Sequence, residues 1–76
     1  MKKFSVFIHG RNFLIRLEEK IERLGFYTTR YVDAEDSALA EFKAVELIQN
    51  DEDLNQNVFN TPENPPMLYA EEIQEI

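Results

Sequence analysis

The sequence predicts an α+β domain in which a small antiparallel sheet carries one main helix on one of its faces. Three observations predict this class. Residues 26–32 are rich in aromatic and β-branched side chains, the segment 34–50 after them is an uninterrupted run of helix formers, and residues 3–9 alternate between apolar and other side chains. The predicted order is β-β-β-α-β, within a single domain that spans residues 1–76.

The first predicted strand covers residues 3–9. Every second residue of this segment is a large apolar one: Phe4, Val6 and Ile8. Such alternation is the period of a strand with one fully apolar face. Gly10 is expected to end the strand.

The segment 11–24 fits two templates. As strands, Gly10 and Arg11 turn the chain into a second strand, 12–17, and Glu18 and Glu19 turn it again into a third strand, 20–33. As a helix over residues 12–24, the segment would give the alternative order β-α-β-α-β, with apolar residues spaced three and four apart along one side: Leu14, Leu17, Ile21 and Leu24. Local propensity alone favours the helix.

Four segments together resemble a family of small uncharacterised bacterial proteins: the turn Gly10–Phe13, the strand GFYTTRYV, the helix segment AVELI and the late NPPMLY. The resemblance covers nearly the whole chain and implies a hairpin at Glu18 and Glu19, where the family's turn typically contains a glycine that this sequence lacks. It therefore favours the strands. The same order is faintly similar to the HicB-type antitoxin fold, although HicB-like glycines and acidic turn motifs are absent. The family brings no known activity with it.

A helix over residues 34–50 is predicted to follow the third strand. Asp33 is expected to cap it, with Asp36 three residues later as in a capping box. Residues spaced three apart should cover the sheet: Leu39, Phe42, Val45 and Ile48. A second apolar line should lie on the other side, either in solvent or as part of a partner surface: Ala40, Ala44 and Leu47.

Residues 51–66 are expected to form a polar loop, which holds all three prolines. Loops of this length in a compact domain are more often functional or mobile than simple connectors. Val58 and Phe59 are expected to pin its middle to the core. The last strand, 67–75, should then lie centrally or beside the first.

The composition argues against an enzyme and against a metal or cofactor site. The chain has no cysteine, and no acid or second ligand has a recognisable spacing to its single histidine, His9. Its two glycines, Gly10 and Gly25, cannot form a Gly-rich phosphate loop. With no signal-peptide core and no long apolar run, the sequence predicts a cytoplasmic protein without a membrane segment.

Charge is divided unevenly along the chain, whose net charge is −7. Residues 1–32 carry seven Lys and Arg against three acids, whereas residues 33–76 carry Lys43 alone against twelve acids. Because a chain of this size buries only roughly 60% of its surface on folding, a partner surface would help its core. The sequence therefore predicts a protein–protein interaction module, as a homodimer or with a protein partner. The alternatives are an antitoxin-like small partner protein and a single-stranded nucleic-acid binder, and the net charge disfavours nucleic acid.

The interface is predicted on the sheet face that the helix leaves open. Neighbouring side chains in a strand point to opposite faces, so Phe7 and His9 must point to the open face. From the later strand, either Phe26 or the pair Tyr27 and Tyr31 must join them. A single domain rarely leaves such a patch in water. The candidate interface, with its arginines as a basic rim, comprises Phe7, His9, Arg11, Arg16, Tyr27, Arg30 and Tyr31.

Overall fold

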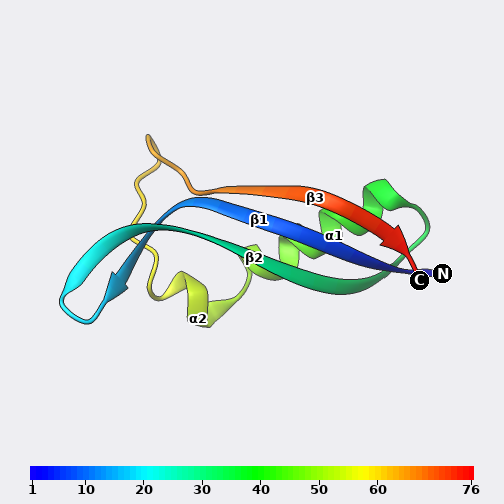
Figure 1. Ribbon diagram of the computed structural model, residues 1–76, viewed down its shortest axis with the longest axis horizontal. Coiled ribbons are helices and arrows are strands. Elements are labelled where there is room, and N and C mark those ends of the chain that lie inside the picture. The colour runs from blue at the N-terminus through cyan, green and yellow to red at the C-terminus, as the bar shows by residue number, and fades with distance from the viewer.

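The computed structural model describes all 76 residues as a three-stranded antiparallel sheet with one long helix on one face (Figure 1). The elements in chain order are β1 (Lys2–Leu17), β2 (Lys20–Ala34), α1 (Ser37–Gln49), α2 (Glu52–Asn55) and β3 (Met67–Glu75). The strand order is β2-β1-β3, so β1 is central. The α+β class is confirmed, and the alternative helix over residues 12–24 is wrong because these residues belong to β1 and β2.

The first two predicted strands are one strand, so the predicted β-β-β-α-β order is wrong in its first half. Between Gly10 and Phe13 the register with β2 shifts, because Arg11 and Asn12 together face Gly25. Asn12 has a φ of 60°, which asparagine tolerates better than most residues. The extra residue is a β-bulge, which bends a strand without ending it. Gly10 is required here, since a Cβ would collide with the ring of Phe26.

A tight hairpin joins β1 to β2, with Glu18 and Glu19 between the paired Leu17 and Lys20. Glu18 has a φ of 58° and Glu19 has no positive φ, which is the pattern of a type II′ turn. The hairpin implied by the family resemblance is therefore present, although no glycine occupies its turn. It extends past the end of α1 and gives the molecule a length of 43 Å (Figure 1).

Helix α1 begins three residues later than predicted. Its N-cap is Asp36, whose Oδ1 accepts a hydrogen bond of 2.9 Å from the Leu39 N–H. Asp33 instead lies in β2, paired with Lys3. The prediction of Asp33 as the cap was wrong because β2 continues to Ala34.

Asp36→Ala is expected to lower the free energy of unfolding by about 0.5–2 kcal/mol, the usual loss when a capping side chain is removed. Asp33→Ala removes the same side chain three residues earlier and should change it by no more than about 0.5 kcal/mol. Urea denaturation of both variants measures the difference. Equal losses would contradict Asp36 as the cap.

The helix packs on the sheet through its smallest residues. The largest core cluster comprises Phe4, Val6, Ile8, Ala34, Ala40, Ala44 and Ile48. The predicted stripe is therefore right for Ile48 and for Val45, which packs against this cluster, and wrong for Leu39 and Phe42, which are exposed. The large side chains of β1 fill much of the space above the sheet, so the first two turns of the helix face it with Ala40 and Ala44, and Ile48 follows one turn later.

Residues 51–66 are fastened to the distal half of β1, beyond the bulge. They begin with α2, and Val58 forms a β-bridge with Ile15, so Val58 holds the segment on β1, while Phe59 is 40% exposed. At the bulge, Asn60 Nδ2 donates to the Asn12 carbonyl at 2.7 Å, and Asn12 Nδ2 donates to Asn64 Oδ1 at 2.8 Å. The segment then leads into β3. This strand lies at the sheet edge beside β1, which is one of the two positions predicted for it.

Candidate functional site: the aromatic face of the sheet

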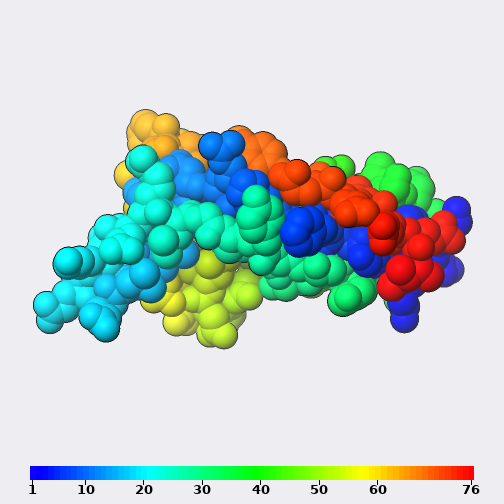
Figure 2. Space-filling model, in the orientation of Figure 1, coloured from blue at the N-terminus to red at the C-terminus, as the bar shows by residue number.

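The sheet face opposite α1 is uncovered and carries a row of aromatic side chains. Figure 2 views this face, with the three strands at the surface and α1 behind them. His9 pairs with Tyr27 on β2 and with Tyr69 on β3, and directly paired residues share a face. We call this surface the aromatic face and define it by Phe7, His9, Tyr27, Tyr31 and Tyr69.

Four of the five rings of the aromatic face, all except Tyr31, contact one another within one molecule. The Tyr27 ring lies nearly parallel to that of Phe7, with centroids 5.4 Å apart, and to that of His9 at 4.4 Å. The Tyr69 ring is tilted against His9 at 6.4 Å. These contacts across three strands fix the rings before any partner arrives, which lowers the entropic cost of binding.

Much of this aromatic surface is open to solvent. Tyr27 and Tyr31 are 62% and 67% exposed, and Phe7 and Tyr69 are about two-fifths exposed. The segment 51–66 pairs with the distal half of β1 instead of covering these rings. Phe26 is not part of the face, because it pairs with Gly10 and packs against buried Phe13 at 4.9 Å. Contiguous exposed apolar patches of this kind mark interaction surfaces in soluble proteins.

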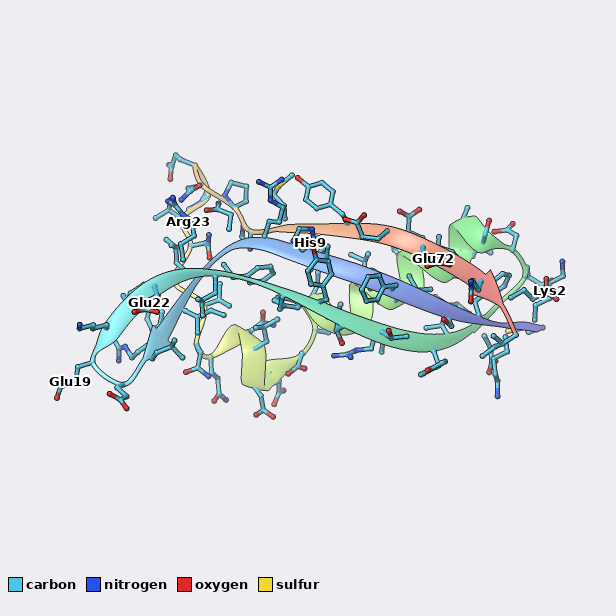
Figure 3. All side chains as sticks on the ribbon, viewed as in Figure 1. Lys2, His9, Glu19, Glu22, Arg23 and Glu72 are labelled. Carbon is cyan, nitrogen blue, oxygen red and sulfur yellow. The ribbon has the colours of Figure 1, made fainter.

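Charges of both signs surround the rings. His9 Nδ1 lies 3.4 Å from Glu71 Oε1, and Glu72 stands on β3 opposite Phe7. At the distal end, Arg11 and Arg23 line a shallow hollow beside His9. Figure 3 shows Arg23 and Glu72 on opposite sides of His9 along the sheet. The aromatic face is therefore basic at its distal end and acidic along β3.

Two predicted interface residues lie outside the cluster of rings, and one of them is on the other face of the sheet. Arg30 pairs with buried Val6, so it lies on the helix side, where its Nη1 donates to Thr28 Oγ1 at 2.6 Å. Arg16 lies beyond the bulge, with its guanidinium carbon 4.8 Å from the centroid of the Phe59 ring. The predicted basic rim therefore keeps Arg11 and loses Arg30, while Arg16, which pairs with Ile21 and so shares the face of Arg23, is engaged by Phe59.

The structure adds four residues that the sequence analysis missed: Arg23, Tyr69, Glu71 and Glu72. Arg23 could have been found, because it lies an even number of residues before Tyr27 on the same strand. Tyr69, Glu71 and Glu72 could not, because their positions depend on the register of β3 against β1. That register shifts between Phe7 and Ile8.

The assembled side chains offer ring stacking, apolar contact and rim charges. No three His, Cys, Asp or Glu side chains are grouped so that they could hold a metal ion. Neither helix has the length and apolar character needed to cross a membrane. Comparison with protein-family models, curated proteins and solved structures gives no match.

Proposed function

We propose that this chain is a protein–protein interaction module that self-associates through the aromatic face. The observation that carries the proposal is the position of α1, which covers one face of the sheet and leaves Tyr27 and Tyr31 on the other face in solvent. Only nine of the 76 residues are buried. A second copy packed on the aromatic face would enlarge this small core.

The aromatic face suits packing between two sheets. Facing sheets lie about 10 Å apart and interdigitate their side chains, and tyrosine and phenylalanine are enriched in interface cores. A two-fold axis that crosses the strands brings the distal end of one copy over the proximal end of the other. Arg11, on the central strand of one copy, then approaches Glu72 of the second, so these rim charges are complementary.

A second candidate is binding of single-stranded nucleic acid. The stacked rings with Arg11 and Arg23 beside them favour it, because bases stack on aromatic side chains while arginines contact phosphates. Glu71 and Glu72 beside the rings and the net charge of −7 oppose it, because they repel phosphates. A mobility-shift assay with mixed single-stranded oligonucleotides tests this candidate. A salt-dependent shift that is lost in the double variant Arg11→Ala, Arg23→Ala would decide for nucleic acid.

Tyr27→Arg is expected to weaken self-association about 30-fold or more, which corresponds to roughly 2 kcal/mol for a central interface tyrosine. Sedimentation equilibrium from micromolar concentration upward measures this change. The arginine also reduces the net negative charge, so general repulsion between copies cannot explain a loss.

Leu17→Arg is the matched control. It adds the same charge at an apolar residue that is 45% exposed on the hairpin tip, away from the aromatic face, and it should leave association unchanged. A wild-type chain that stays monomeric to its solubility limit contradicts the proposal. If Tyr27→Arg and Leu17→Arg weaken self-association equally, the cause is the added charge and not the lost tyrosine ring.

A further inference from the structure

A cavity lies on the helix side of the sheet, beside the end of α1. It has a volume of about 220 Å³ and is bounded by the end of α1, by α2 with Val58 after it, by β1 at the bulge and by the start of β3. Figure 1 shows α1 along one half of the sheet and α2 beyond its end. The 13-residue helix is about 20 Å long in a molecule of 43 Å, so it cannot cover the whole face, and the short α2 leaves this space beside it.

The lining of the cavity is mostly apolar, and no charged side chain takes part in it. Phe13 and Ile48 form a buried floor, and half-buried side chains such as Leu54 form the walls. Only three of the ten lining residues are exposed: Gln49, Asn55 and Met67. These three mark the mouth. A concave, mostly apolar space with a few polar groups at its mouth is typical of a site for a small molecule.

Contacts within the chain hold the walls of the cavity in place. Asn55 Nδ2 donates to the Gln49 carbonyl at 2.7 Å, which ties α2 to the end of α1 at the mouth. On the other side, the β-bridge between Val58 and Ile15 fixes the segment after α2 to β1. The cavity is therefore preformed, and a ligand that enters it has little of the chain to order.

We propose that this cavity binds a small, neutral ring compound of about nine non-hydrogen atoms. An apolar cavity of roughly 150 Å³ holds benzene, which has six such atoms, and this cavity is about one and a half times as large. A charged ligand is disfavoured, because burying a charge without a partner is costly and no charged side chain lines the space. A rigid ring also loses less conformational entropy on binding than a flexible chain of the same size.

Indole and benzoate test the proposal in the wild-type chain, because each has nine non-hydrogen atoms and only benzoate is charged. NMR titration of protein with labelled methyl groups should give saturable shifts with indole and a Kd of about 1 mM or lower. Intermolecular NOEs should run from indole to the methyl groups of Ile48, Leu54 and Val58, which line the cavity. Benzoate should bind at least about tenfold more weakly, because its carboxylate finds no partner there.

Val45→Phe fills part of the cavity and is expected to weaken indole binding about tenfold or more, because the added ring occupies the space of the ligand. Val32→Phe is the matched control. Both valines are half-buried and pack against the main core cluster, but Val32 does not line the cavity. The control should therefore keep the Kd for indole within about threefold of the wild-type value. The same NMR titration measures both variants.

Three results in the wild-type chain overturn the inference: no saturable shift up to the solubility limit of indole, equal binding of indole and benzoate, or NOEs from indole to Tyr27 and Tyr31 in place of the cavity methyl groups. These measurements decide the matter even if Val45→Phe does not fold. A folded Val45→Phe variant that binds indole as tightly as the wild type also overturns it. Failure of self-association leaves the inference standing, because the cavity and the aromatic face lie on opposite sides of the sheet.

Discussion

Ile8→Ala is expected to lower the free energy of unfolding by about 2–5 kcal/mol. Ile8 is fully buried in the central strand, between Thr28 of β2 and Ala70 of β3. The substitution removes apolar atoms from the core and leaves a cavity beneath α1. A chain of this length has a total stability of only about 4–11 kcal/mol, so one substitution removes a large share of it. Urea denaturation in dilute solution, below the range of self-association, measures the loss.

Phe7→Ala is the matched control on the neighbouring residue. Phe7 points to the aromatic face, is 37% exposed and stacks on Tyr27. Its removal should cost clearly less than that of Ile8, because Phe7 is already partly exposed and its loss leaves no enclosed cavity. Similar losses for Ile8→Ala and Phe7→Ala would contradict the assignment of the two sheet faces.

Ala44→Leu is expected to lower the free energy of unfolding by about 1–3 kcal/mol, because it overpacks the contact between helix and sheet. Ala44 has no exposed surface, and a leucine there must move α1 away from β1. Ala38→Leu makes the same change at an exposed position of the same helix and should alter stability by less than about 0.5 kcal/mol. Thermal denaturation resolves the two, since 1 kcal/mol shifts the Tm by roughly 4–8 °C in a domain of this size.

The reverse order of stability losses would indicate a different orientation of α1. If Ala44→Leu is neutral while Phe42→Ala is costly in the dilute monomer, then α1 is rotated so that Phe42 faces the sheet. That is the orientation the sequence alone predicts.

Local patterns were sufficient to predict most elements of the fold. The alternation of Phe4, Val6 and Ile8 predicts both the strand and its buried face, since period two has no helical equivalent. Residues 11–24 carry apolar side chains that fit either period, so local propensity favours a helix there. In the structure, pairing along the whole of β1 and β2 overrides this propensity, as tertiary context often does.

The rotation of α1 could not be predicted in the same way. The helix has two apolar lines, one through Leu39 and Phe42 and one through Ala40 and Ala44. Which line faces the sheet depends on how much space the side chains of β1 leave, and that is a property of the assembled layers. The alanine line fits because Phe4, Val6 and Ile8 are large.

The candidate site was predictable in part. Once Tyr27 and Tyr31 are placed on the open face, the alternation of side chains along a strand puts Arg30 on the helix side. The sequence alone could therefore have excluded Arg30 from the interface. The position of Arg16 depends on the bulge at Arg11 and Asn12, which sets its pairing with Ile21, and on the packing of Phe59; short-range patterns reveal neither.

Intermolecular NOEs test the aromatic-face interface most directly. A mixture of isotopically labelled and unlabelled chains, at a concentration where sedimentation shows association, reports only contacts between copies. The expected result is NOEs from the Tyr27 and Tyr31 rings of one copy to side chains of the aromatic face of the other. Association without any intermolecular NOE at these rings would contradict the aromatic face as the interface.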